Sequence, residues 1–371
     1  AGDDIIDMTG NDANDEFVVL TYASLQDPIT VTIDGQANTG SVDKGAAGSD
    51  TLLGVATPLA AGWTNGGLAI VGTGGDDVFD LAPEGQQWMS VASTAGVDSF
   101  TINGTGLVRM DFRDADTGIN MNLGLASGQI IDDGFGNTET IAGGTPLWEV
   151  YGSFHNDSFT GSTADESYRY AGGNNTLDGG DGFDRLRYDT GNVLGVEANL
   201  ETGTVDVNTF DRASPQAELN IISTVDTVQG FEFVRGSNGS DTLTGDANDN
   251  RLEGRGGNDI LVDGLGSDTL IGGQGEDFFT IVGGGQDVIN DFEIGVDVLN
   301  VVVDGLSVTD RNAALTGASL DGDGNAVADF GNGNVLKFRG LTTEDVASLA
   351  QDGPPPLPPS PTPVAWTVGD P

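Results

Sequence analysis

Residues 236–280 of this 371-residue chain read as five nine-residue units that follow one another without a break in register. Written out, they are GSNGSDTLT, GDANDNRLE, GRGGNDILV, DGLGSDTLI and GGQGEDFFT. The sixth position holds Asp241, Asn250, Asp259, Asp268 and Asp277, and the eighth holds Leu243, Leu252, Leu261, Leu270 and Phe279. A disordered linker rich in Gly and Asp has no reason to repeat a large apolar residue every nine positions. The fixed period therefore predicts a solenoid of stacked units.

The residue types in each unit predict a cation-binding turn followed by a short strand. Glycines permit a tight turn and let carbonyl oxygens converge on a cation. The Asp that closes the turn adds a hard carboxylate oxygen, which is the type of ligand that Ca²⁺ prefers. The three residues after the Asp predict a strand whose middle side chain points inward.

The pattern G-G-x-G-x-D-x-U-x, in which U is large and apolar, resembles the calcium-binding nonapeptide of the RTX family. The unit that begins at Gly272 matches it at every position. The resemblance implies an all-β, right-handed parallel β-roll, in which two units form one coil and each ion lies between turns stacked on one edge. It pairs the unit at Gly236 with those at Gly254 and Gly272, and the unit at Gly245 with that at Asp263.

The resemblance also implies the calcium ligands, which are the sixth-position carboxylates and the backbone carbonyls of nearby glycines. The carboxylates are Asp77, Asp157, Asp184, Asp241, Asp259, Asp268, Asp277 and Asp287, with Asp4 and Asp15 as weaker candidates. The glycines are Gly180, Gly182, Gly236, Gly254, Gly257, Gly264, Gly266, Gly273 and Gly275. Several Ca²⁺ ions are therefore the expected cofactor.

A second block of units covers residues 152–187, and its last unit, GGDGFDRLR, matches fully with Asp184 as ligand and Leu186 as core. Its two middle units carry Glu166 and Asn175 at the sixth position. We therefore expect weaker or no ion binding there, and coils that serve only packing. Residues 282–290 add a sixth unit to the main block, offset by one residue. Residues 2–7 resemble half a unit, so we expect the chain to be a piece of a longer protein.

A longer repeat underlies the nonapeptides, because three of them align and share the same upstream segments. They are 72–80, 152–160 and 236–244. A short apolar strand precedes each, at 68–71, 148–151 and 231–235. An alternating apolar and polar strand, followed by a turn signal, lies further upstream, at 29–33, 119–123 and 196–200. The sequence thus predicts three related modules, at 1–96, 97–187 and 188–303.

The remaining residues predict an end for the solenoid. Residues 291–299 resemble the strand pair that commonly follows an RTX block. Residues 304–352 predict a polar cap, with hairpin turns at 323–324 and 331–334 and a helix over 341–350. In the Pro-rich tail at 353–371, residues 353–363 predict a stiff, extended spacer.

The charge of the chain excludes several classes of partner. With 58 acidic and 13 basic residues, the net charge of −45 opposes compaction unless cations neutralise it. Nucleic acids and anionic membranes need basic patches, so neither is expected as a partner. No apolar run is long enough to span a bilayer, and the absence of cysteine excludes disulfides.

The candidates for catalysis are weak, so we predict that this chain is not an enzyme. The H-E-x-x-H motif of zinc proteases and the G-x-S-x-G motif of lipases are both absent. His155, the only histidine, is interpreted as a surface turn residue. Asp132 and Asp133 resemble the paired carboxylates of polysaccharide-cleaving enzymes, but no basic subsite accompanies them.

Two further motifs have ordinary structural explanations. The DGDGN sequence at 321–325 lacks the Gly and Glu of an EF-hand, so it predicts a hairpin turn. Five aromatic residues suggest either a sugar-binding strip or, more often, core packing. They are Trp63, Trp88, Trp148, Tyr151 and Tyr168.

Two functional classes remain open. In the first, the chain is a calcium-folded extracellular region of a large secreted surface protein, with a structural or adhesive role. Its partners would be Ca²⁺, further copies of itself or a cell-surface polysaccharide. In the second, it is the calcium-dependent folding and export module of a secreted enzyme, such as a polysaccharide lyase or epimerase. The RTX resemblance places either protein outside a Gram-negative cell.

Overall fold

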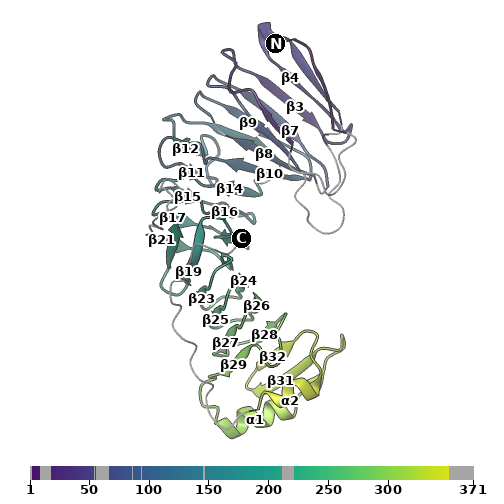
Figure 1. Cartoon of the computed structure of the whole chain (residues 1–371), viewed down its shortest axis with the longest axis vertical. Coiled ribbons are helices and arrows are strands. Elements are labelled where there is room, and N and C mark those ends of the chain that lie inside the picture. The colour runs from purple at the N-terminus through teal and green to yellow at the C-terminus, as the bar shows by residue number, and fades with distance from the viewer. Residues whose placement is uncertain are drawn as a thin grey trace, which may run out of the picture. The chain divides into compact units, whose positions relative to one another are not determined.

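The computed structural model describes residues 2–8, 18–53, 55, 67–85, 87–92, 94–144, 147–210 and 221–350. The chain divides into two units (Figure 1). The first unit consists of residues 1–187 with 224–231, and the second consists of residues 188–223 with 232–371. Both are built almost entirely from short strands, as predicted for an all-β chain. The three module boundaries remain a prediction.

Two sheets carry the nonapeptide strands of the second unit, and their neighbours pair in parallel. One sheet has the order β22 (Phe233–Arg235), β24 (Arg251–Gly256), β26 (Thr269–Gln274) and β28 (Gln286–Ile289). The other has the order β23 (Thr242–Thr244), β25 (Ile260–Val262), β27 (Phe278–Ile281) and β29 (Val298–Val301). Successive units therefore alternate between the sheets, which confirms the predicted pairing.

The eighth-position side chains form the core between these two sheets. Leu243 lies in register with Leu261 and Phe279, and Leu252 lies in register with Leu270. All five side chains are 0% exposed. Because each coil repeats after two units, every apolar side chain stacks on an equivalent one, and the fully buried leucines each contribute about 1.5–3 kcal/mol by leaving water.

The first unit contains three groups of strands. The first group has the order β1 (Ile5–Asp7), β5 (Ser49–Leu53), β4 (Thr39–Asp43), β3 (Thr30–Asp34), β7 (Val78–Ala82), β9 (Ser99–Ile102) and β13 (Thr140–Gly143). The second has the order β2 (Val18–Thr21), β6 (Leu68–Val71), β8 (Trp88–Ala92), β10 (Leu107–Asp111), β14 (Glu149–Tyr151), β16 (Ser167–Arg169) and β18 (Arg185–Arg187). The third has the order β12 (Ile130–Asp132), β11 (Asn120–Asn122), β15 (Ser158–Thr160), β17 (Thr176–Asp178) and β21 (Ile221–Gln229), of which residues 224–229 belong to this unit.

One arrangement occurs three times in the part of the chain that the structure describes. A hairpin strand pairs in parallel with the strand of the first nonapeptide of each predicted module, as β3 with β7, β11 with β15, and β19 (Val193–Asn199) with β23. The same hairpin strand pairs antiparallel with its successor, which is β4, β12 or β20 (Thr204–Phe210). The three alternating segments are thus structurally equivalent, as their sequences predicted.

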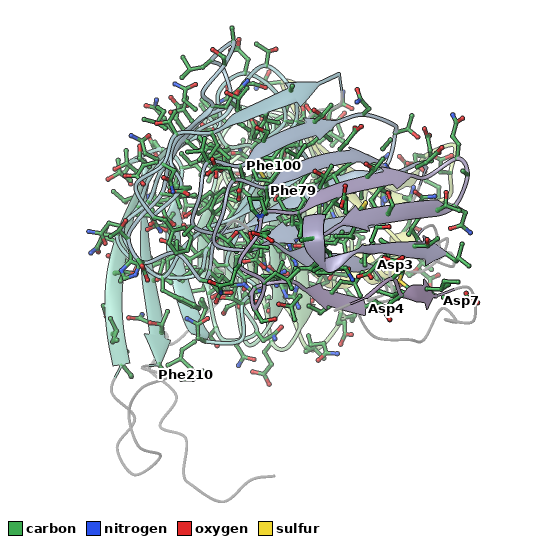
Figure 2. The ribbon with its side chains drawn as sticks, turned by 90° about the horizontal axis from the view of Figure 1, so that it is seen from above. Asp3, Asp4, Asp7, Phe79, Phe100 and Phe210 are labelled. Atoms are coloured by element: carbon green, nitrogen blue, oxygen red, sulfur yellow. The ribbon has the colours of Figure 1, made fainter. Side chains whose placement is uncertain are left out.

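Stacked aromatic rings continue this register inside the first unit. Phe79 of β7 lies opposite Phe100 of β9, and their ring centroids are 5.2 Å apart with nearly parallel planes. Figure 2 shows the two phenyl groups beside one another. Offset stacking of this kind adds about 0.5–1.5 kcal/mol to the burial of the rings.

The C-terminal cap follows its predicted pattern, with one element that the sequence analysis missed. β30 (Ser319–Leu320), β31 (Ala326–Gly331) and β32 (Asn334–Phe338) pair antiparallel, and β32 joins β28 in parallel. Helix α2 (Thr343–Ser348) begins with a capping box between Thr342 and Asp345. Helix α1 (Val308–Thr316) was not predicted, because its apolar residues do not form a clear stripe.

Two smaller expectations are resolved here. Residues 291–297 form turns and bends before β29 rather than the first strand of a pair. No helix among the described residues has the length and apolar character needed to cross a membrane.

Candidate metal centre

The sixth-position residues of the second unit lie in two columns along the turn edges. In the first column, the backbone N–H of Asp241 donates to Asp259 Oδ1 at 2.8 Å, and that of Asp259 donates to Asp277 Oδ1 at 2.9 Å. Asp297 continues this column at 3.0 Å. In the second column, Asn250 N donates to Asp268 Oδ1 and Asp268 N to Asp287 Oδ1, at 2.7 and 3.0 Å. The predicted ligands Asp259, Asp268, Asp277 and Asp287 are therefore brought into register.

The first unit contains columns of the same kind. They are Asp77–Asp98–Glu139, Asp157–Asn175–Asp226 and Glu166–Asp184, and each residue donates its N–H to the side chain of the next. The sequence analysis missed Asp98, Glu139, Asp226 and Asp297. The signal for Asp98 was present, since residues 93–101, STAGVDSFT, keep the fourth-position Gly, the sixth-position Asp and an eighth-position Phe.

The first-position glycines have a steric function that the motif alone did not predict. At Gly236, Gly254 and Gly272, a Cβ atom would lie closer than 3.0 Å to the sixth-position Oδ2 of the same unit. The missing side chain therefore makes room for the carboxylate. The other predicted glycines adopt positive φ, which favours glycine. They are Gly180, Gly182, Gly257, Gly264, Gly266, Gly273 and Gly275.

In one type of turn, the residue at the second position closes the carboxylate. Ser237 donates its N–H to Asp241 Oδ2 at 2.7 Å and its hydroxyl to Asp241 Oδ1 at 2.9 Å. The same two bonds join Thr73 to Asp77 and Ser153 to Asp157. We call these closed turns. An ion at the predicted ligands Asp77, Asp157 or Asp241 would have to compete with these hydrogen bonds, and these three assignments remain predictions.

A second type of turn lacks this hydroxyl, and one oxygen of its carboxylate has no hydrogen-bond donor. Asp259 Oδ2 and Asp268 Oδ2 are buried and have no hydrogen-bond partner within the described part of the chain. Their second positions are Arg255 and Gly264, both with positive φ. We call these open turns. A buried carboxylate oxygen without a donor carries a large desolvation cost, so these turns fit a cation.

Asp263 adds a third carboxylate to one of the open turns. It occupies a first position, where the other four units of residues 236–280 carry Gly. Carboxylate oxygens of Asp263, Asp268 and Asp287 all lie within 4.8 Å of one another, and the three residues are at most 2% exposed. Three negative charges at this separation repel strongly unless protons or a cation lie between them. The sequence analysis missed Asp263 because the family pattern has no carboxylate there.

Burial and mutual repulsion raise the pKa of these groups. Desolvation, followed by the charge of Asp241, raises the pKa of Asp259 to about 9. Burial raises the pKa of Asp268 to about 8 and the pKa of Asp263 to about 7. It raises the pKa of Asp277 and of Asp287 to about 6. Without cations, keeping these buried carboxylates ionised in the folded chain therefore costs free energy.

Near the N-terminus the protein supplies its own cation. Lys44 is 5% exposed and forms an ion pair with Asp50, while its Nζ donates to Gly2 O at 2.7 Å. Burial raises the pKa of Asp50, but the hydrogen bonds from Lys44 and Tyr22 outweigh it and lower this pKa below the ordinary value. Asp4, a weaker predicted ligand, is largely exposed at this end. The other weak candidate, Asp15, lies outside the described residues.

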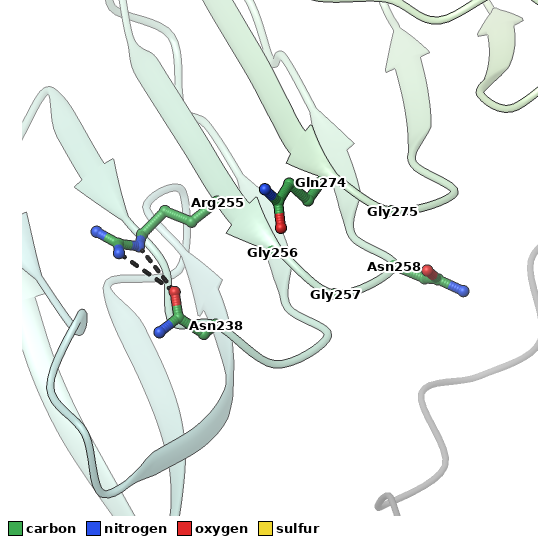
Figure 3. A pocket seen from close by; sticks show the side chains of 7 residues that line it. All are labelled: Asn238, Arg255, Gly256, Gly257, Asn258, Gln274 and Gly275. Atoms are coloured by element: carbon green, nitrogen blue, oxygen red, sulfur yellow. Dashed lines mark hydrogen bonds between the residues drawn. The ribbon is translucent and has the colours of Figure 1, made fainter. Parts of the chain in front are cut away.

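Arg255 stabilises the open turn of Asp259 from outside. Its guanidinium donates to Asn238 Oδ1 at 3.2–3.3 Å and to Asp189 Oδ2 at 3.0 Å. Figure 3 shows the Arg255–Asn238 pair beside a shallow pocket that Asn258, Gln274 and glycines of adjacent turns also line. These anchors offset the strain of a non-glycine residue with a φ of 87°.

The remaining sequence candidates lie in turns, loops and the core. His155 is exposed in its turn, as predicted, and Tyr168 is a fully buried core residue that donates to Asp157. Asp132 and Asp133 accept hydrogen bonds from the backbone of the loop that follows them. Asp321 accepts from Asn325 and pairs with Lys337 at 2.9 Å, which fits the predicted hairpin. Trp63 lies outside the described residues.

Comparisons with known proteins identify the repeats. A family model described as "RTX calcium-binding nonapeptide repeat (4 copies)" matches residues 171–192, 226–261 and 253–289. The extracellular lipase LipA from Serratia marcescens has a solved structure that is 16% identical, with a TM-score of 0.20. That match covers 56% of this chain but only 43% of the lipase, and a likeness this weak carries no argument. No curated protein matches the chain.

Proposed function

We propose that this chain, which carries RTX calcium-binding nonapeptide repeats, is a calcium-folded region of a secreted protein with a structural or adhesive role. One observation carries the proposal. Sixth-position carboxylates of the second unit are buried and stacked in register, 18 or 19 residues apart, and their open turns leave oxygens without donors. In a chain with a net charge of −45, such columns need cations in order to pack.

Sixth-position carboxylates would hold the ions. These are Asp259 and Asp277 in one column and Asp268 and Asp287 in the other, together with Asp184 in the first unit. Bound Ca²⁺ supplies the positive charge that the turn edges lack. The chain's own residues supply oxygen ligands, a steric gap at the first-position glycines and a buried apolar core behind each turn. Carboxylate oxygens are the hard ligands that Ca²⁺ prefers.

Calcium binding and folding are one event in this proposal. Extracellular calcium modules bind in the range of about 10⁻⁴–10⁻³ M, well above the calcium concentration of a cytoplasm. The carboxylates within each column repel one another until ions are bound. The chain would therefore stay unfolded inside the cell and fold after export. The RTX repeats support this location, because proteins of that family are secreted.

The structural or adhesive role rests on architecture. A hairpin and a nonapeptide strand recur in the same pairing three times, which suits a repeated, extended part of a surface protein better than a single binding cleft. The alternative, a folding module of a secreted enzyme, keeps the same calcium chemistry. The two differ in their neighbours, since the second requires a catalytic domain in the same gene.

Circular dichroism of the chain, titrated with Ca²⁺ from chelator to about 10 mM, tests the proposal. We expect a cooperative rise in β signal that Mg²⁺ does not reproduce. Replacing Asp259, Asp268 and Asp277 together by Ala should abolish this transition in the second unit. The matched control replaces the exposed Asp206, Asp304 and Asp323, which removes the same charge away from the turn sites. An unchanged titration in the first variant would refute the site assignment.

Assembly is tested separately. We expect sedimentation velocity to show larger species with Ca²⁺ than with chelator if the role is structural. A monomer under both conditions, together with a catalytic domain elsewhere in the gene, would favour the enzyme module.

A further inference from the structure

The first unit contains a buried carboxylate cluster outside the segments that match the nonapeptide family. Asp98 and Glu139 are each 1% exposed, and Asp133 is 0% exposed. Asp98 directly precedes β9 and Glu139 directly precedes β13, and these strands pair with Ser99 opposite Thr140. The pairing places the two carboxylates side by side, although 41 residues separate them along the chain.

Each carboxylate uses only one of its oxygens. Asp98 N donates to Glu139 Oε1 at 3.1 Å, and Asp77 N donates to Asp98 Oδ1 at 2.9 Å. The other oxygens, Asp98 Oδ2 and Glu139 Oε2, are buried and have no hydrogen-bond partner among the described residues. Thr94 Oγ1, at the second position of the Asp98 turn, is in the same condition. This turn is therefore open, even though its second residue carries a hydroxyl.

The charges around the pair are negative. Burial and the carboxylates of Asp77, Asp133 and Asp76 raise the pKa of Asp98 to about 7. Burial and the carboxylates of Asp98 and Asp133 raise the pKa of Glu139 to about 9.

Asp133 cannot relieve this charge by turning away, because the N–H groups of Phe135 and Asn137 hold its Oδ1 at 2.8 and 2.9 Å. A buried cluster of one sign requires a counter-ion or a proton.

We propose that Asp98 and Glu139 bind a divalent cation, with Thr94 Oγ1 as a neutral ligand and Asp133 as a supporting charge. The available atoms are all oxygens, which selects a hard cation such as Ca²⁺ over Zn²⁺ or Cu²⁺. The site differs from the turns of the main block because its two acids lie 41 residues apart along the chain, rather than 18 or 19. The assignment of Ca²⁺ as the ion rests on the proposed function. The arrangement of Asp98, Glu139 and Thr94 does not depend on it.

Counting bound ions tests the site directly. Equilibrium dialysis of the whole chain should show about one Ca²⁺ ion fewer for Glu139→Gln than for the wild type, with the β-rich spectrum retained. Asp76→Asn is the matched control, because it removes a neighbouring charge at an exposed position and should leave the count unchanged. An unchanged count in Glu139→Gln, with higher stability at neutral pH, would mean that the pair holds a proton and would overturn the proposal.

A measurement on the wild-type chain covers the case in which the variant fails to fold. In crystals in which a lanthanide replaces Ca²⁺, we expect an anomalous peak between Asp98 Oδ2 and Glu139 Oε2. Peaks at the Asp259 and Asp268 turns without one here would refute this site and leave the proposed function intact. A peak between Asp98 and Glu139 with none at the Asp259 and Asp268 turns would support this site and refute the ion sites of the proposed function.

Discussion

The carboxylate of Asp259 fills the space that a side chain at Gly254 would need. Its Oδ2 lies closer than 3.0 Å to the position of a Cβ on Gly254, and Asp241 and Asp277 lie in the same way against Gly236 and Gly272. The first glycine of the motif is therefore part of the carboxylate turn. It leaves room for the carboxylate that the turn must hold.

Gly254→Ala should consequently weaken calcium-induced folding of the second unit. The added methyl group forces Asp259 or the turn to move, and overpacking of this kind costs about 1–3 kcal/mol. The midpoint of the calcium titration should move to higher concentration. Gly74→Ala is the control, because a Cβ at Gly74 meets nothing within 4 Å. Equal midpoints for the two variants would show that the close approach has no energetic consequence.

Leu261→Ala should destabilise the calcium-bound second unit by about 2–5 kcal/mol, because it opens a cavity in a fully buried stack. Urea unfolding at saturating Ca²⁺ measures the loss. Leu265→Ala is the matched control in the next nonapeptide. Leu265 is 53% exposed, so its loss should change stability by less than about 0.5 kcal/mol. A small effect at Leu261 would contradict a core built on the eighth position.

Open and closed turns should respond differently to loss of the carboxylate charge. Asp268→Asn should lower the number of bound Ca²⁺ ions by about one, because the orphaned Oδ2 is the atom that we assign to the ion. Asp157→Asn should destabilise the first unit but keep the ion count, since Ser153 and Tyr168 already donate to Asp157. Equilibrium dialysis separates the two, and a lost ion in Asp157→Asn would restore the original prediction for that residue.

Asp263→Asn should weaken calcium binding at the Asp268–Asp287 turn by about an order of magnitude, because the charge of the ligand set tunes calcium affinity. The variant keeps an acceptor oxygen for the N–H groups of Gly264 and Val282. Asp249→Asn is the control, since Asp249 is exposed but acts on the same two carboxylates through its charge. Isothermal titration calorimetry should show the larger loss for Asp263. Equal losses would indicate long-range charge rather than direct ligation.

The pH dependence of the calcium-free chain follows from the raised pKa values. Asp259 and Asp268, with pKa values of about 9 and about 8, bind protons in the folded state that the unfolded chain has already released. Their contribution to stability is complete below the unfolded value of 3.8 and is lost as pH rises toward about 9. In chelator, the β signal should therefore be stronger at pH 5 than at pH 8.

Saturating Ca²⁺ should remove most of this dependence above pH 7, because ions then take the place of the protons. Calcium affinity itself should fall as pH drops below about 9, because protons compete for the oxygens of Asp259 and Asp268, and it should fall further below about pH 6 as Asp277 and Asp287 take up protons. A calcium-free chain that becomes more stable with rising pH would refute the desolvation argument. Circular dichroism at matched ionic strength measures both effects.

Much of the second unit follows from the sequence, because a strict nine-residue period repeats one local structure. The period determined which side chains face inward, from Leu243 to Phe279, and which turns share an edge. It also predicted the sixth-position carboxylates as a set. These inferences succeed because turn chemistry and apolar spacing are local properties, which neighbouring residues specify without help from distant ones.

Only the structure shows which sixth-position carboxylates are closed by a donor in their own turn. Ser237 closes the turn of Asp241, whereas Asp259 in the next coil keeps an orphaned oxygen, and the motif reads the same at the sixth position of both. Asp98 and Glu139 meet across 41 residues because β9 and β13 pair, and no fixed period connects them. Burial of the turns and the approach of Asp98 to Glu139 depend on contacts between distant segments, so the sequence determined the repeat and its core, and tertiary packing decided where the charge is left uncompensated.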